Sequence, residues 1–173
     1  MRGLNSGNII YLFLTYVFLV TSCEKQNTPE ANVVINELMA VNSTTIPDQN
    51  GEYDDWIELF NNSSFELDLS GYYISDSRSS LARWQFPAGT KIPAKGYLVI
   101  WADADTLQSG LHTNFKLSAD GEKLYFSNRE VLIIDKVEYP AQTQELAYAR
   151  NPDWSGSFRW QTPTFGMTNN LKK

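Results

Sequence analysis

Residues 54–61 read Asp-Asp-Trp-Ile-Glu-Leu-Phe-Asn and form the densest run of strand-forming side chains in the polar part of the chain. Ile57 and Leu59 lie on one side of this stretch, and Glu58 lies on the other with two aromatic residues. A period of two is typical of a strand that packs one face on a core and turns the other toward solvent. The stretch therefore predicts a β-protein with Ile57 and Leu59 in its core and Glu58 on a solvated rim.

Short stretches of the same kind recur at intervals of about 8–12 residues, the spacing of β-sandwiches and barrels. The expected strands are residues 32–40, 56–60, 65–69, 72–75, 83–86, 97–102, 115–117, 123–127 and 131–137. Residues 97–102 are nearly all apolar, which predicts burial on both faces. The pair Asp120-Gly121 predicts a hairpin between residues 115–117 and 123–127. We expect one all-β domain over residues 31–170.

The N-terminus has the pattern of an export signal. Arg2 precedes an apolar run over residues 9–20 that only Thr15 interrupts. A helix of this length would span about 18 Å, too short for a hydrocarbon core about 30 Å thick. Residues 1–22 are therefore expected to be a signal peptide rather than a membrane span.

The end of that signal resembles a bacterial lipobox, Val20-Thr21-Ser22-Cys23, and Cys23 is the sole cysteine of the chain. The resemblance implies cleavage before Cys23 and acylation of its thiol, and several acyl chains anchor a protein stably to a membrane. Residues 23–30 would then be the lipidated cysteine and a flexible tether. Position 24 is Glu rather than Asp, so we expect the cell envelope, with the outer membrane favoured.

The acidic residues are concentrated near the N-terminus, in a chain of net charge −6. This excess argues against a nucleic-acid partner, because phosphate binding needs a basic patch. One loop places oxygen-bearing side chains at alternate positions, Asp48, Asn50, Glu52 and Asp54. Ca²⁺ takes six to eight oxygen ligands, so the loop is a candidate calcium site, although its spacing departs from that of an EF-hand. The alternative is a solvated turn whose side chains cap the backbone.

Two carboxylates, Glu37 and Glu58, stand between apolar residues on strands that are expected to be neighbours. Such a pair could serve a glycoside hydrolase. The simpler interpretation is that each faces solvent or pairs with a base such as Arg150, because no other feature of an active site accompanies them. His112, the sole histidine, is expected in a surface turn. No catalytic activity is therefore predicted.

Aromatic residues provide the candidate binding site. Trp154 and Trp160 lie in the loop region of residues 152–157, where exposed indole rings could stack on a sugar or contact a protein. Packing within the domain would use them equally well.

Several sequence blocks together resemble the lamin tail domain, which occurs in nuclear lamins and in many secreted bacterial proteins. The blocks are residues 35–40, 55–61, 67–76, 86–90, 96–100, 115–118, 121–122, 134–139, 148–150 and 163–169. Each is weak alone, but they stand in the family's order. The resemblance implies an immunoglobulin-like β-sandwich. We expect a lipid-anchored binding or adhesion module of the cell envelope, with an unknown protein or glycan partner; the alternatives are a glycan-binding accessory module and a small hydrolase that uses Glu37 and Glu58.

Overall fold

The structure, a computed structural model, describes residues 32–170. The expected signal peptide (1–22), Cys23 and the tether (23–30) lie outside the described residues. Eleven strands follow one another: β1 (Val33–Met39), β2 (Trp56–Asn61), β3 (Leu67–Asp68), β4 (Tyr73–Ser75), β5 (Trp84–Gln85), β6 (Lys91–Ile92), β7 (Tyr97–Trp101), β8 (Gly121–Ser127), β9 (Ile133–Pro140), β10 (Ala147–Asn151) and β11 (Ser157–Gln161). In this range no helix is long and apolar enough to cross a bilayer.

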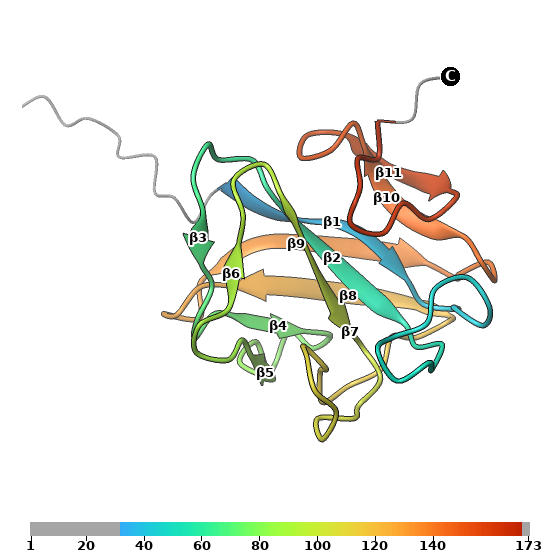
Figure 1. The fold of residues 1–173 in the computed structure, drawn as a ribbon, viewed down its shortest axis with the longest axis horizontal. Coiled ribbons are helices and arrows are strands. Elements are labelled where there is room, and N and C mark those ends of the chain that lie inside the picture. Colours follow the sequence, from blue (N-terminus) through green and yellow to red (C-terminus); the bar gives the residue numbers. More distant parts are fainter. Residues whose placement is uncertain (1–31, 171–173) are drawn as a thin grey trace, which may run out of the picture.

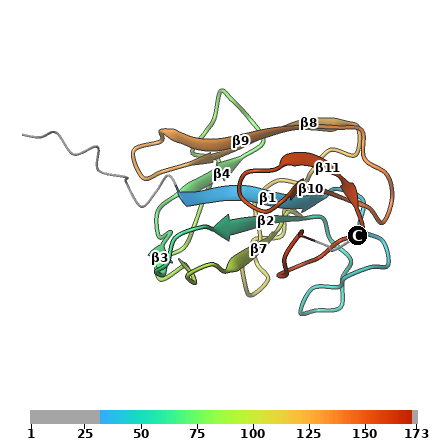
Figure 2. The ribbon, with the colours of Figure 1, turned by 90° about the horizontal axis from the view of Figure 1, so that it is seen from above.

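Two antiparallel sheets are packed face to face (Figure 1, Figure 2). One has five strands in the order β11-β10-β1-β2-β7, and the other has four in the order β5-β4-β8-β9. A two-stranded ribbon of β3 and β6 lies at the end of the molecule where β1 begins (Figure 1). The prediction of an immunoglobulin-like all-β sandwich is confirmed.

The main core fills the space between the sheets. Ile57 and Leu59 of β2 are fully buried there, together with Ile74 of β4 and Phe126 of β8. Alternation along each strand directs these side chains inward from both sheets, as in other sandwiches. The predicted core face of β2 is confirmed.

A β-bulge in β1 changes which side chains face outward. Ile35 pairs with Leu59 and Glu37 pairs with Glu58, so Asn36 is an extra residue in β1. An extra residue in one strand shifts the alternation by one position. Asn36 and Glu37 therefore both lie on the outer face of the five-stranded sheet, opposite Glu58.

That outer face is covered, contrary to the expectation of a solvated rim. All six residues of β2 are buried. The ring of Phe165, in the C-terminal segment 162–170, packs edge-on against Trp56 with centroids 5.2 Å apart and lies tilted against Trp101 at 5.5 Å. The alternation of β2 was correctly predicted, but a second layer of chain replaces the solvent that a two-sheet sandwich would have on this side.

Several strand predictions were wrong. Strands β6, β10 and β11 were not expected, and residues 115–117 form only an isolated bridge between Lys116 and Asp103. The hairpin predicted at Asp120-Gly121 is absent from residues 32–170, since β8 pairs with β4 and β9. Gly121 has a φ of +90°, and a Cβ there would lie 2.5 Å from the Tyr139 carbonyl oxygen. This glycine permits a close strand approach rather than a tight hairpin turn.

Strand β7 is less buried than its apolar sequence predicted. It is the edge of its sheet, and only Ile100 and Trp101 of its five residues are buried. An edge strand has no neighbour on one side, so hydrophobic content alone overestimates its burial.

An ion pair joins the two sheets where β10 diverges from β1. The Arg150 guanidinium donates through Nη2 to both Asp135 carboxylate oxygens at 3.0 Å, and its Nε donates to the Ile35 carbonyl at 2.8 Å. Asp135 Oδ2 in turn accepts from the Ile35 N–H at 2.9 Å. The two side chains thus provide the hydrogen bonds that a neighbouring strand would otherwise make to the backbone of Ile35. Arg150 binds Asp135 rather than Glu37 or Glu58, which corrects the expected pairing.

Candidate functional site

Glu37 and Glu58, the carboxylate pair predicted from sequence, lie on adjacent strands and are fully buried. The expectation that they face solvent is wrong. Glu37 accepts hydrogen bonds from the Thr164 N–H at 2.9 Å and contacts the Thr164 hydroxyl at 2.5 Å. Glu58 accepts from the Gly166 N–H at 2.6 Å and from the Asn36 amide at 3.2 Å. The partners come mainly from the segment that covers the sheet.

The Thr164 hydroxyl joins Glu37 to Asn169. It donates to Glu37 Oε2 at 2.5 Å and lies 2.6 Å from Asn169 Oδ1. Burial raises the pKa of Glu37 to about 7. Burial raises the pKa of Glu58 to about 8, with repulsion from Glu37 as the second-largest cause.

Asp153, in the β10–β11 loop, completes this network. Its Oδ1 accepts from the Asn36 amide and the Asn169 N–H, and its Oδ2 accepts from the hydroxyls of Tyr97 and Thr168. Burial and the adjacent Asp153 raise the pKa of Tyr97 above its usual range. The three carboxyl groups thus join β1, β2, the β10–β11 loop and the C-terminal segment. These hydrogen bonds hold parts of the same chain together, and both Glu37 and Glu58 are closed off from solvent.

The acidic loop between β1 and β2 forms a second cluster of carboxylates, at the opposite end of the sandwich from the start of β1 (Figure 1). Asp48, Glu52 and Asp54 each place one carboxylate oxygen within 4.8 Å of the others. Asn50, the fourth predicted ligand, donates its backbone N–H to Asp48 and its side-chain amide to Gln108. The structure therefore brings the three acids together and places Asn50 in the bonds that hold the loop.

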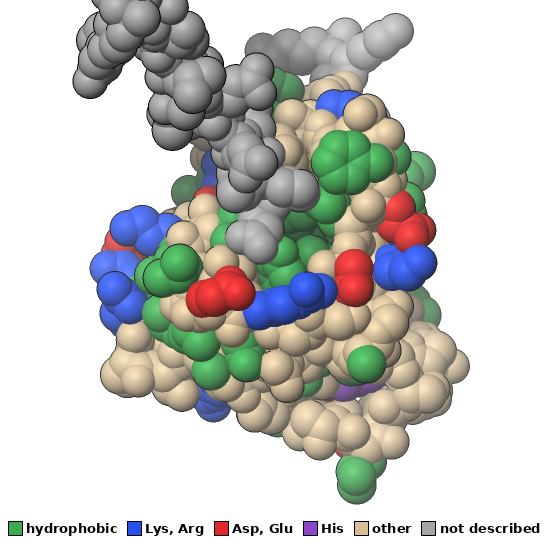
Figure 3. Space-filling view, turned by 90° about the vertical axis from the view of Figure 1, so that its left-hand side faces the viewer, with side chains coloured by type: hydrophobic (Ala, Val, Ile, Leu, Met, Phe, Trp, Pro, Cys, Tyr) green, Lys and Arg blue, Asp and Glu red, His purple; other side chains and the backbone are tan. Residues whose placement is uncertain are grey.

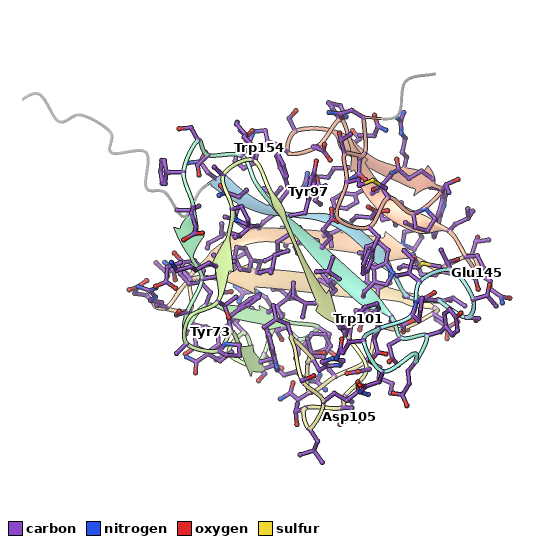
Figure 4. The ribbon with its side chains drawn as sticks, viewed as in Figure 1. Tyr73, Tyr97, Trp101, Asp105, Glu145 and Trp154 are labelled. Carbon is purple, nitrogen blue, oxygen red and sulfur yellow. The ribbon has the colours of Figure 1, made fainter. Side chains whose placement is uncertain are left out.

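The acidic loop is held to the loop that follows β7. Gln108 donates to Glu52 Oε2 at 2.7 Å, and Gln49 bonds the Ser109 carbonyl and His112 Nε2. His112 Nδ1 lies 2.6 Å from Asp103 Oδ2. Only 3% of His112 is exposed, so its predicted place in a surface turn is wrong. Asp105, beside Asp103, lies toward the tip of this second loop (Figure 4).

Trp154 and Trp160, the predicted aromatic binding residues, are both partly buried. Trp154 lies in the β10–β11 loop near Tyr97 (Figure 4), and its backbone N–H donates to Asn36. Trp160 lies in β11 rather than in a loop and packs on Tyr148 with ring centroids 5.1 Å apart. Partial exposure leaves both rings able to contact a ligand, and their role in glycan binding stays a prediction.

Comparison with known proteins addresses the identity of the fold. The family model of the lamin tail domain matches residues 26–141. The chain belongs to the lamin tail domain family. The comparison with curated proteins found no match. Strands β10 and β11, with the C-terminal segment that donates to Glu37 and Glu58, lie beyond the matched part of this lamin tail domain.

A hollow in the lamin tail domain was missed by sequence reasoning. It has a volume of about 340 Å³ and lies along β8 and β9 beside the loop after β4. Its lining residues are Arg78, Lys123, Tyr125, Ile133, Lys136, Val137 and Glu138. Three bases thus surround a partly apolar floor, and one acid, Glu138, pairs with Lys123 at 3.1 Å. The bases come from separate elements, so only the fold brings them together.

Proposed function

We propose that this lamin tail domain protein is a lipid-anchored binding module of the cell envelope with no catalysis of its own. The lipobox pattern at residues 20–23 supports the anchor. The burial of Glu37 and Glu58 beneath the C-terminal segment supports binding over hydrolysis, because a catalytic carboxylate must reach its substrate.

The hollow beside β8 and β9 carries the binding proposal. Its volume falls within the usual range of about 300–1,000 Å³ for ligand sites. Arg78 and Lys136 form no ion pair within residues 32–170, so both charges are available to an incoming group. The chemistry fits a partner that presents carboxylate or phosphate groups over a small apolar surface.

With an acylated Cys23, the place where the described residues begin would set which end of the domain lies nearest the membrane. Eight residues, 24–31, lie between Cys23 and Asn32, where the described chain begins. Fully extended, they reach about 30 Å. The end nearest the bilayer would then be that of β3 and β6, where acidic and basic side chains alternate (Figure 3) in the pairs Lys91–Glu66 and Arg129–Asp68. The acidic loop would face away from the membrane.

The anchor is tested on the exported protein. Intact-mass spectrometry and labelling with a clickable fatty acid should show a chain that begins at Cys23 and carries acyl groups, and the Cys23→Ser variant should lose the label and leave the membrane fraction. Unmodified Cys23 or an uncleaved N-terminus would refute the anchor.

The hollow is tested by retention on immobilised polygalacturonate, a carboxylate polymer, with neutral dextran as the comparison. The Lys123→Ala/Lys136→Ala double variant should lose retention, whereas Lys91→Ala, which removes a base on β6, should keep it. Loss of retention in Trp154→Ala or Trp160→Ala with normal behaviour of the lysine variant would favour the glycan-binding module built on the indole rings. Equal retention of all variants would overturn both binding surfaces.

A further inference from the structure

Two buried carboxylate oxygens in the acidic loop, Asp48 Oδ2 and Asp54 Oδ2, have no hydrogen-bond partner among the described residues. Asp48 is 93% buried, its exposed fraction being 7%. Buried polar atoms in folded proteins nearly always have a partner. An unpaired carboxylate oxygen is especially unfavourable because it carries charge. Both atoms therefore point to a ligand that is neither backbone nor side chain.

The loop holds Asp48 so that one oxygen remains available. Its Oδ1 accepts from the N–H groups of Asn50 and Glu52, each at 2.8 Å. The Asp48 N–H donates to the Glu52 carbonyl at 2.8 Å and closes the turn. Asn42 ties the base of the loop, since its amide donates to the carbonyls of Ile46 and Asp54. The direction of Asp48 Oδ2 is thus set by the backbone.

The spacing of the three acids matches a single ion. One carboxylate oxygen from each of Asp48, Glu52 and Asp54 lies within 4.8 Å of the other two. Two oxygens on opposite sides of a Ca²⁺ ion, each at about 2.4 Å, are about 4.8 Å apart. Glu52 is held in place by Gln108 from the neighbouring loop. Three ligands from one loop can therefore surround a common point.

The local charge favours a cation. Asp103 adds further negative charge that acts on Asp54, beside that of Asp48 and Glu52. Lys116 is the base that acts on Asp54. A divalent ion among the three acids would remove the repulsion between them and supply the missing partner of both unpaired oxygens.

We propose that Asp48, Glu52 and Asp54 bind one Ca²⁺ ion, which fixes the acidic loop against the loop after β7. Three carboxylates on a loop suit Ca²⁺, whose coordination is flexible. Mg²⁺ keeps several waters and is usually held by one or two carboxylates. Water and loop oxygens would complete the coordination shell. Extracellular calcium modules bind with dissociation constants of about 10⁻⁴–10⁻³ M, and we expect this range.

The test is isothermal titration of the detergent-solubilised full chain with CaCl₂ and with MgCl₂, after treatment with EDTA. Thermal melts accompany each titration, because a ligand that binds only the folded state raises the melting temperature. We expect one Ca²⁺ per chain, weaker binding of Mg²⁺, and a Ca²⁺-dependent rise of the melting temperature.

Charge-neutral variants identify the ligands. Asp54→Asn and Glu52→Gln should each weaken Ca²⁺ binding at least about tenfold, because affinity follows the charge of the ligand set. Both should melt at or above the wild-type temperature in EDTA, since each removes repulsion between like charges. Asp120→Asn makes the same charge change in an exposed turn and should bind as wild type does. Glu52 is exposed, so its variant tests the proposal even where a change at Asp48 prevents folding.

Three results would overturn the proposal. The first is the absence of saturable heat and of a melting shift at millimolar Ca²⁺. The second is wild-type affinity in both Asp54→Asn and Glu52→Gln. The third is equal affinity for Mg²⁺, which would remove the assignment to calcium.

Discussion

The buried pair Glu37 and Glu58 predicts that the protein becomes less stable as the pH rises from about 5 to about 9. Four donors reach the two carboxyl groups, but none of the bonded partners is a base. Asp153 adds further negative charge nearby, and it raises the pKa of both residues. Without a compensating cation, the folded state favours the protonated forms.

The direction follows from the pKa in the folded and unfolded states. Below 4.5, the ordinary pKa, both groups are protonated in either state and the full stability is present. As the pH rises, the unfolded chain releases its protons first, while the folded chain holds them until the pH passes about 7 for Glu37 and about 8 for Glu58. The free energy of unfolding therefore falls through this window and stays low above it.

The size of the effect can be worked from Glu58. Its pKa rises from 4.5 to about 8. Since one pKa unit corresponds to about 1.36 kcal/mol, the shift amounts to about 5 kcal/mol. The whole stability of a domain is about 5–15 kcal/mol, so the loss would be a large part of it. It is an upper value for global unfolding, because release of segment 162–170 would let water reach both groups at smaller cost.

Urea unfolding followed by tryptophan fluorescence at several pH values measures this loss. Trp56 contacts Phe165 of the covering segment, so its fluorescence also reports local release. The Glu37→Gln/Glu58→Gln double variant should lose most of the pH dependence. At about pH 9 it should be more stable than wild type, although each hydrogen bond that the new amides form less well reduces the gain by about 1 kcal/mol. Glu130→Gln, an exposed change of the same kind, should follow wild type.

Asp55 contributes in the same direction, because burial raises its pKa to about 6. The double variant separates the two contributions, since it leaves Asp55 unchanged. A wild-type stability that is flat or rises between about pH 5 and about pH 9 would contradict the reasoning, as would a double variant with an unchanged slope.

Two further predictions concern stability. Asp135→Asn leaves the Arg150 guanidinium without its carboxylate, and both side chains are less than one-fifth exposed. Urea unfolding should therefore show a loss of about 3 kcal/mol. Glu66→Gln, which breaks an exposed pair with Lys91, should change stability by less than about 1 kcal/mol, and equal effects of the two variants would show that the Arg150 pair does not hold the sheets together. Gly121→Ala should cost about 3 kcal/mol from steric overlap and backbone strain, whereas Gly89→Ala, at a φ of +84° with open space around it, should cost about 1 kcal/mol; thermal melts that rank the two variants the other way would show that β8 and β9 can separate at Gly121.

Much of the fold could be predicted because it rests on local alternation. Ile57 and Leu59 repeat at the period of a strand, and the burial of one face follows directly from it. The acids of the β1–β2 loop could also be found, because side chains within seven consecutive residues of one loop lie close together. Asp48, Glu52 and Asp54 are such a set.

The remainder depends on contacts between distant parts of the chain. Glu58 is buried by residues more than one hundred positions later, and an isolated strand carries no sign of a second covering layer. The hollow combines Arg78 with Lys123 and Lys136, whose nearness follows from sheet order alone. Strand β11 alternates the aromatic Phe158 and Trp160 with polar residues, so this strand carried a local signal that the sequence prediction missed.

The bulge at Asn36 explains how two like charges came to lie opposite each other. Val33, Ile35, Leu38 and Ala40 all belong to the main core. Val33 and Ile35 are two residues apart, as are Leu38 and Ala40, but Ile35 and Leu38 are three apart. A regular strand cannot bury both pairs on one face. One extra residue restores the burial of Leu38 and turns Glu37 outward, opposite Glu58. The spacing of the apolar residues in β1 thus carries the signal of the bulge, and the bulge in turn requires the donors that Thr164 and Gly166 provide.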